Sequence, residues 1–223
     1  MDFIYNKVLS LLKHNDYVVI LISGASCSGK STAAKMLQEK FFDLPCICIC
    51  QDSWFKDYSD IKRGVLGYPN MESSDSFHIN EFRNDISLIL KEKTAYIPDY
   101  SITSNTRISK NKLIKFEKIL IIEGLHAVSV LADILYDFAG RPQHDNSASG
   151  EIKKTGFCGF VLNTPVEICV KRRALRDKKF FPYKDSRFFI NHYLTVISEN
   201  YKPFFEIEEK TARQNENIFL HMI

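Results

Sequence analysis

The sequence contains few of the features that direct a protein to a membrane or a nucleic acid. No stretch approaches the roughly 20 consecutive apolar residues of a membrane-spanning helix. The first residues lack the basic-then-apolar arrangement of a signal peptide, since Asp2 and Lys7 interrupt it. The 30 lysines and arginines nearly balance the 27 aspartates and glutamates, and the net charge of +3 is too small to argue for nucleic-acid binding. We therefore expect a cytoplasmic protein with neither a nucleic acid nor a membrane as its partner.

The six cysteines lack the spacing that zinc sites show. Such sites normally pair cysteines about two to four residues apart, with a second pair at a distance, and that second pair is missing. Cys46, Cys48 and Cys50 alternate with isoleucines, so in a strand their thiols would share one face but lie too far apart to bridge easily. We interpret the cysteines as buried thiols in a reducing compartment.

Alternating apolar segments predict an α/β fold. Five strands are indicated, at residues 17–23, 46–50, 117–124, 156–162 and 218–222. Helices are indicated at residues 2–14, 29–41, 78–91, 127–138, 165–179 and 186–210. This alternation favours a mostly parallel five-stranded sheet with helices on both faces, in a single domain over residues 1–223. Residues 51–75 and 94–112 are expected to be mostly irregular, and residues 140–155 to form a flexible surface insertion.

The segment after the first predicted strand has the pattern of a phosphate-binding loop. It matches G-x-x-x-x-G-K-[ST] at every fixed position, between a strand and a helix as the motif requires. Gly24 and Gly29 allow backbone N–H groups to surround a polyphosphate, and the helix start adds its positive dipole end. Lys30 would reach the β- and γ-phosphates, and Ser31 would bind Mg²⁺. The motif predicts nucleoside triphosphate binding by Gly24, Ala25, Ser26, Cys27, Ser28, Gly29, Lys30, Ser31 and Thr32.

Two missing motifs narrow the class of nucleotide-binding protein. A GTPase would carry an Asn-Lys-x-Asp motif, and the sequence has none. Mechanical ATPases usually end the second acidic strand in an Asp-Glu pair, whereas this strand ends in Glu123 and Gly124. A kinase that acts on a small molecule is the class that remains.

Further segments, read together, resemble the uridine kinase family, including its nicotinamide riboside kinase relatives. They occur in the family's order and are Gln51–Lys56, Tyr68–Phe77, Ile97–Arg107, Ile121–Gly124, Lys171–Asp177 and Tyr201–Glu206. They are similar, in turn, to the family motifs Q-D-[SD]-F-[YF], N-F-D-H-P-D-A-F, P-x-Y-D-F-x-x-H-x-R, F-E-G, R-R-x-x-R-D and V-K-P-x-F-E. The resemblance implies a P-loop kinase fold with a small helical lid at residues 171–188. It also implies ATP and a small molecule as partners, while a homo-oligomer stays open.

Two carboxylates have the positions that phosphoryl transfer requires. Asp52 ends the strand expected to lie beside the phosphate-loop strand, where it can accept the proton of a sugar hydroxyl. A helix or turn cap is the alternative for Asp52. Glu123 would bind Mg²⁺ with Ser31, and Asp52 completes this predicted metal set. A carboxylate on the surface is the alternative for Glu123.

Arg173 and Arg176 lie three residues apart on one helix face, which suits them to bracket a transferring phosphate. Taken alone, a basic run is more often a solvated helix end or a nucleic-acid patch. In the presence of the kinase motifs we assign both arginines to a closing lid. With Lys30 and Asp52 they form the set of catalytic candidates.

The acceptor-binding residues come from the resemblance alone and are Glu72, Tyr100, Asn105, Arg107, Lys184 and His192. Four of them depart from the family pattern. Glu72 replaces the ribose-binding aspartate, and Asn105 replaces the histidine that uridine kinases direct at the pyrimidine. Lys184 replaces a lid arginine, and His192 replaces the glutamine opposite the base.

The remaining two acceptor candidates each have an alternative role. Tyr100 would contact the substrate or pack in the core, and Arg107 would contact the substrate or hold its loop. The sequence as a whole predicts ATP- and Mg²⁺-dependent phosphorylation of a ribonucleoside 5′-hydroxyl, with uridine or cytidine as the leading acceptor. A kinase for another small acceptor, such as nicotinamide riboside, is one alternative. A nucleotide-binding regulator without turnover is the other.

Overall fold

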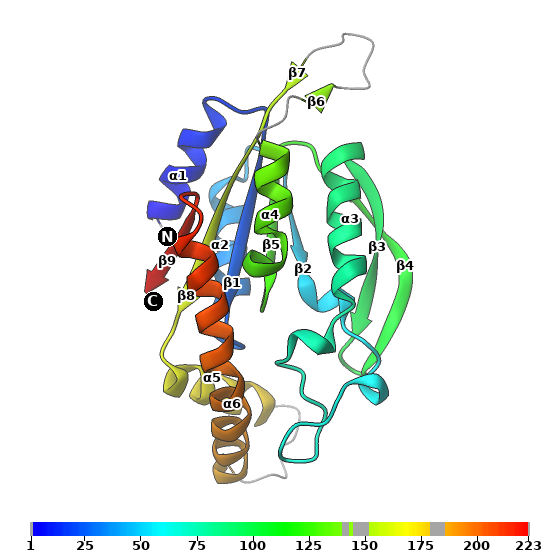
Figure 1. The fold of residues 1–223 in the computed structure, drawn as a ribbon, viewed down its shortest axis with the longest axis vertical. Helices are drawn as coiled ribbons and strands as arrows, with labels where there is room; N and C mark the ends of the chain where they lie inside the picture. Colours follow the sequence, from blue (N-terminus) through cyan, green and yellow to red (C-terminus); the bar gives the residue numbers. More distant parts are fainter. Residues whose placement is uncertain (1, 140–142, 145–151, 179–185, 223) are drawn as a thin grey trace.

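A five-stranded sheet with the order β2-β5-β1-β8-β9 runs through the middle of the molecule (Figure 1). The structure is a computed structural model that describes residues 2–139, 143–144, 152–178 and 186–222. The strands of this sheet are β1 (Tyr17–Gly24), β2 (Cys46–Cys50), β5 (Ile119–Gly124), β8 (Thr155–Asn163) and β9 (Ile218–Met222). Each neighbouring pair is parallel. The predicted α/β fold with a five-stranded parallel sheet is therefore confirmed.

Helices cover both faces of the sheet (Figure 1). They are α1 (Asp2–Leu12), α2 (Lys30–Lys40), α3 (Ile79–Glu92), α4 (Ala127–Ala139), α5 (Val166–Lys178) and α6 (Ser186–Arg213). In β1, Val18 and Ile20 pack with α1 and α2, whereas Val19 and Leu21 pack with α3 and α4. Successive side chains of a strand point to opposite faces, so one apolar run supplies both cores. None of the helices within the described residues has the length and apolar character needed to cross a bilayer.

The expectation that residues 94–112 are irregular is wrong. They lie mainly in an antiparallel hairpin, formed by β3 (Thr94–Ser101) and β4 (Thr106–Lys115). Nearly every residue of β4 is exposed, so this strand lacks the apolar run by which buried strands are recognised. The register also shifts around Pro98 in β3, which further breaks the alternation.

Two predicted segments are described only in part. The expected insertion at residues 140–155 contains the short strands β6 (Gln143–His144) and β7 (Ile152–Lys153), which pair antiparallel. Its other residues before 152 lie outside the described residues, and its flexibility stays a prediction. The expected lid at residues 171–188 includes residues 179–185, which also lie outside them.

The carboxyl ends of the parallel strands meet at one end of the sheet, the lower end in Figure 1. The segment after β2 reaches this end through three short 3-10 helices, η1 (Gln51–Trp54), η2 (Tyr58–Asp60) and η3 (Ser74–Ser76). Helix α5 and the first half of α6 lie at the same end (Figure 1). The strand order corrects one expectation: β2 pairs with β5 rather than with β1. Glu123, not Asp52, therefore ends the strand next to the phosphate-loop strand.

Candidate active site

The loop between β1 and α2 depends on two glycines. Gly29 precedes α2 with a φ of 107°, in the left-handed region that favours glycine. A Cβ atom at Gly24 would lie 3.1 Å from the backbone oxygen of Leu162 in β8, so a side chain there would displace the neighbouring strand. Lys30 Nζ donates to the carbonyl oxygens of Gly24 and Ala25, at 2.9 and 3.0 Å. These bonds hold the ammonium group at the loop, where a polyphosphate would meet it.

Two oxygen-bearing side chains meet beside this loop. Ser31, in the first turn of α2, donates its hydroxyl to Glu123 Oε1 at 2.9 Å. Glu123 is 5% exposed at the end of β5. Its charge also acts on the nearby carboxyl group of Asp52. Since Mg²⁺ binds hydroxyl and carboxylate oxygens, Ser31 and Glu123 suit a magnesium ion, and Asp52 as a third ligand stays a prediction.

The Asp52 carboxyl group lies where the other candidate groups converge. Its side chain stays accessible to solvent, yet the protein around it removes enough water to raise its pKa to about 6. The charges of Glu123 and Glu72 raise this pKa further, whereas Lys30 and Arg176 lower it. Residues predicted to bind the donor, the metal and the acceptor therefore act on one carboxyl group. A carboxyl with a pKa this close to neutrality suits a general base.

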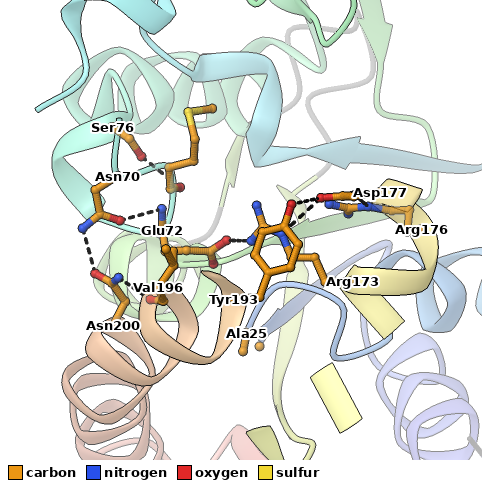
Figure 2. A network of polar contacts seen from close by, with 12 residues as sticks. Ala25, Asn70, Glu72, Ser76, Arg173, Arg176, Asp177, Tyr193, Val196 and Asn200 are labelled. Carbon is orange, nitrogen blue, oxygen red and sulfur yellow. Dashed lines mark hydrogen bonds and ion pairs between the residues drawn. The ribbon is translucent and has the colours of Figure 1, made fainter. Parts of the chain in front are cut away.

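Glu72 and Arg173 form a largely buried ion pair, shown in Figure 2. Arg173 Nη1 donates to Glu72 Oε1, and the two side chains are 15% and 9% exposed. The Arg173 guanidinium also lies 4.6 Å from the ring centre of Tyr193. The Tyr193 hydroxyl donates to Asp177, which accepts a second hydrogen bond from Arg176 Nε at 2.7 Å. Burial alone would lower the pKa of Arg173, but the Glu72 charge and its other partners raise it.

We call residues 61–76 the acceptor loop, because it contains Glu72. Besides the ion pair to α5, the loop has two contacts with α6. In the first of these, Asn70 Nδ2 donates to Asn200 Oδ1 at 3.0 Å (Figure 2). Asn70 is itself held within the loop, where its Oδ1 accepts from the Glu72 backbone N–H at 3.2 Å. Tyr68 lies 5.4 Å from His192, ring centre to ring centre. The acceptor loop is thus joined to both α5 and α6.

Sequence reasoning missed the arginine that touches the phosphate loop. Arg172 Nη1 donates to the carbonyl oxygens of Cys27 and Ser28, at 3.4 Å each. The Thr164 hydroxyl donates to the same Ser28 carbonyl at 2.8 Å. These contacts anchor the start of α5 to the loop. The basic run at residues 171–173 signals an arginine here without showing which one faces the loop.

The structure places three acceptor candidates on the β3–β4 hairpin. The Tyr100 ring packs 5.3 Å from Phe55, and its buried hydroxyl has no hydrogen-bond partner among the described residues. Arg107 Nη2 donates to both carboxylate oxygens of Glu81 in α3 at 2.6 Å, so this side chain holds the hairpin. Asn105 lies exposed at the hairpin turn, with a φ of 53°. Lys184 lies outside the described residues, and its role stays a prediction.

Two buried polar residues at this end of the sheet were also missed. Gln51 directly follows β2, and His126 directly precedes α4. The backbone N–H of His126 donates to Gln51 Oε1 at 2.8 Å. Their only signal in the sequence is proximity to Asp52 and Glu123, so neither could be selected without the structure.

Kinases that transfer a phosphoryl group to a small molecule need donor phosphates held beside a carboxyl group that can activate the acceptor hydroxyl. The phosphate loop and Asp52 lie at the same end of this sheet. The fold and the site place the chain among the P-loop kinases. Residues 19–138 match the profile of the Phosphoribulokinase / Uridine kinase family. Because the match covers more than half of the chain, the chain belongs to this family, as the motifs indicate.

Individual relatives agree with this assignment. The uridine kinase of Ureaplasma parvum serovar 3 is 26% identical over 216 residues, which cover 92% of this chain and 93% of the relative. Among solved structures, YFH7 from Saccharomyces cerevisiae covers 100% of this chain and 98% of its own, at 12% identity and a TM-score of 0.69. D-glycerate 3-kinase from Cryptococcus neoformans covers 100% and 94%, at 12% identity and a TM-score of 0.60. At these identities the structural likenesses show the fold alone.

Proposed function

We propose that this chain phosphorylates the 5′-hydroxyl of a ribonucleoside, with ATP as donor and uridine or cytidine as acceptor. The observation that carries the proposal is the position of Asp52, whose carboxyl group is influenced by Lys30 from the phosphate loop and by Glu72 from the acceptor loop. A general base for phosphoryl transfer has to stand between donor and acceptor. Family membership and the similarity to uridine kinases support the choice of acceptor.

The phosphate loop would bind the ATP donor. Backbone N–H groups of residues 24–32 and the Lys30 ammonium would hold the phosphates. Mg²⁺ held by Ser31 and Glu123, with Asp52 bordering the site, would neutralise charge on the transferred group. The existing hydrogen bond between Ser31 and Glu123 brings their oxygens close enough to serve one ion.

The transfer itself uses Asp52 as proton acceptor. The 5′-hydroxyl oxygen bonds to the γ-phosphorus as its proton passes to Asp52, and the bond to the β–γ bridging oxygen breaks to release ADP. Arg176 is half-exposed and its charge acts on Asp52, so it can stabilise charge on the transferring group. Arg172, bonded to the loop carbonyls, keeps a second cation beside the donor.

The acceptor side centres on Glu72, whose carboxylate can accept hydrogen bonds from ribose hydroxyls. Arg173 neutralises Glu72 here, so a ribose would have to share or displace this partner. Nicotinamide riboside is the alternative acceptor, because the position of Asn105 does not support a contact with a pyrimidine. The residue that aligns with the pyrimidine-reading histidine lies at an exposed turn rather than beside Glu72's buried partners.

The proposal is tested by acceptor-dependent ADP formation with ATP and Mg²⁺ across uridine, cytidine, the purine nucleosides and nicotinamide riboside. We expect turnover with uridine or cytidine, and its loss in Lys30→Ala. Lys35→Ala, which removes an exposed lysine of the same helix, is the matched control and should keep wild-type activity. Wild-type protein that binds ATP but forms ADP with none of these acceptors would contradict the proposal and favour the regulator alternative.

A further inference from the structure

Trp54 and Asp85 form a buried hydrogen bond that the proposed reaction leaves without a role. Trp54 ends the short helix η1 and is fully buried, and Asp85 lies in α3 and is 4% exposed. Trp54 Nε1 donates to Asp85 Oδ2 at 2.9 Å. The other oxygen, Asp85 Oδ1, accepts from Lys110 in β4. The carboxylate thus connects η1, α3 and the β3–β4 hairpin.

Stability alone does not account for a carboxylate at position 85. Its neighbours in α3, Phe82, Ile86 and Ile89, lie in the main apolar core, and the Trp54 ring packs 4.7 Å from that of Phe82. A carboxylate in such a place gains little stability over an apolar side chain of similar volume, because it loses its water. What it does provide is geometry, since a fully hydrogen-bonded carboxylate holds the indole ring in one orientation.

Asp52 lies in η1 between two buried residues whose side chains are hydrogen-bonded. Gln51 begins η1, and its Oε1 accepts the backbone N–H of the residue before α4 at 2.8 Å. Trp54 ends η1; Asp85 holds its ring, and its carbonyl oxygen accepts the backbone N–H of the residue before α3 at 2.9 Å. The Phe55 N–H closes the turn by donating to the Asp52 carbonyl oxygen at 3.1 Å. These bonds together fix the backbone that carries the Asp52 carboxyl group.

The polar contacts of Asp85 continue to one of the acceptor candidates. Lys110 Nζ also lies 3.3 Å from Glu81 Oε1, one turn before Asp85 in α3. Glu81 in turn accepts from Arg107 through both carboxylate oxygens at 2.6 Å. Asp85 therefore joins this network of the β3–β4 hairpin to η1, which carries Asp52.

We propose that Asp85 is a positioning residue, which holds the Asp52 carboxyl group in place for proton transfer through its hydrogen bond to Trp54. This inference rests on the proposed function, in which Asp52 accepts the proton of the 5′-hydroxyl. A general base works only within hydrogen-bond reach of its proton, and a displacement of about 1 Å can cost about a hundredfold in rate. A hydrogen bond that serves stability alone would leave kcat of the folded protein unchanged.

Two single substitutions remove the hydrogen bond from opposite sides. Trp54→Phe deletes the N–H donor, keeps an aromatic ring in the core and leaves the ion pair between Asp85 and Lys110 in place. Asp85→Ala deletes the acceptor, whereas Asp85→Asn keeps an oxygen that can still accept from the indole. Asp133→Asn, which breaks the ion pair of α4 with Arg83 in α3, is the matched control, because the Asp133 side chain is 66% exposed. Thermal unfolding and the affinity for a non-hydrolysable ATP analogue establish that each variant is folded with its donor site intact.

The measurement is kcat and KM for ATP, with the nucleoside that the wild-type chain uses. We expect kcat to fall about tenfold or more in Trp54→Phe and Asp85→Ala and less in Asp85→Asn, with KM for ATP unchanged. The double variant should be no slower than the slower single variant, because both changes remove one bond. In an Asp52→Asn background, Asp85→Ala should lower the residual rate no further. A wild-type kcat in either single variant, or an equal loss of rate in the Asp52→Asn background, overturns the inference; if Asp85→Ala does not fold, Trp54→Phe decides alone.

Amide hydrogen exchange gives a second readout that does not depend on turnover. Exchange of the Phe55 N–H reports on η1, because this group donates to the Asp52 carbonyl oxygen. We expect Trp54→Phe and Asp85→Ala to speed this exchange about tenfold, and Asp133→Asn to leave it at the wild-type rate. Unchanged exchange in either of the first two variants overturns the inference even if the enzyme is active. A wild-type chain inactive with every nucleoside instead contradicts the proposed function, whereas faster exchange at Phe55 would still establish that Asp85 fixes the turn.

Discussion

Asp52 combines a proposed catalytic role with an environment that disfavours its charge. Removal of water, together with the charges of Glu123 and Glu72, disfavours its ionised form. Replacing Asp52 with Asn should therefore raise the melting temperature at pH 8, because the unfavourable charge is gone. The same change should lower kcat by about 10²–10⁴-fold, because the general base is lost.

These two effects are measured by thermal unfolding and by acceptor-dependent ADP formation on the same protein samples. Asp60→Asn, in the exposed turn of η2, serves as the comparison and should change neither quantity. A lower melting temperature for Asp52→Asn would show that the carboxylate stabilises the fold, which would contradict the raised pKa of Asp52.

The Glu72–Arg173 pair makes a different prediction at the residue scale, since both side chains are largely buried. Glu72→Gln leaves the guanidinium without its charge partner and should destabilise the protein by about 3 kcal/mol. Arg173→Met should have a similar cost, and the double variant should cost clearly less than the two single changes together. Urea unfolding of the four proteins measures this coupling.

The exposed ion pair between Lys62 and Asp75 in the same acceptor loop is the matched control, with side chains 82% and 59% exposed. The corresponding double-mutant cycle for Lys62→Met and Asp75→Asn should give a coupling below about 1 kcal/mol. Equal coupling energies for the two pairs would contradict the idea that burial makes the Glu72–Arg173 pair special.

At the scale of elements, Glu208 joins α6 to α4 and β1. It is fully buried, its two carboxylate oxygens accept from the Ser129 backbone N–H at 3.3 Å each, and it also meets the Ser23 hydroxyl. Burial raises its pKa to about 7, from an ordinary value of 4.5. The folded protein therefore holds this proton more tightly than the unfolded chain does.

The free energy of unfolding should therefore fall as pH rises through the pKa of Glu208. The stability that protonated Glu208 contributes is fully present below about pH 4.5 and is lost as pH rises through about 7, a change of about 3 kcal/mol. Urea unfolding at several pH values should show this loss in the wild type relative to Glu208→Gln, in which residue 208 does not titrate. Glu209→Gln, at the partly exposed neighbour, should follow the wild type. A pH-independent difference between wild type and Glu208→Gln would contradict the assignment.

The elements also show what the sequence can predict. The three central strands β1, β5 and β8 are covered on both faces, so their apolar runs identify them without further information. β4 is mostly exposed and contains three lysines, and its pairing with β3 is what makes it a strand. Strand order depends on contacts between distant segments. For this reason the sequence did not reveal that β2, which precedes Asp52, pairs with β5 and not with β1.

The residues of the candidate site also differ in whether the sequence alone predicts them. A contiguous motif defines the phosphate loop, so its residues could be assigned from the sequence. Arg172 and His126 contact residues that lie far away in the chain, Cys27 for the first and Gln51 for the second. Their roles follow from the folded arrangement and from no local pattern.

At the scale of the whole molecule, polar contacts connect the acceptor loop with α5 and α6 (Figure 2). Glu72 links the loop to α5, and Asn70 links it to Asn200 in α6, while Arg172 ties α5 to the phosphate loop. An acceptor bound at Glu72, as proposed, would therefore act on elements that also touch the phosphate loop. Such a link is a coupling free energy, and it must work in both directions.

We expect uridine to tighten the binding of a non-hydrolysable ATP analogue by about fivefold or more, and the analogue to tighten uridine by the same factor. Asn200→Ala removes the hydrogen bond to Asn70 without touching Glu72, Arg173 or the phosphate loop. Calorimetric titrations should then give unchanged affinity for the analogue alone but a smaller effect of uridine on it. Thr195→Ala, an exposed change in the same helix, should keep the wild-type coupling. Equal coupling in the Asn200→Ala and wild-type proteins would show that the acceptor loop communicates with the donor site without α6, and the Glu72–Arg173 pair would then remain as the connection to test.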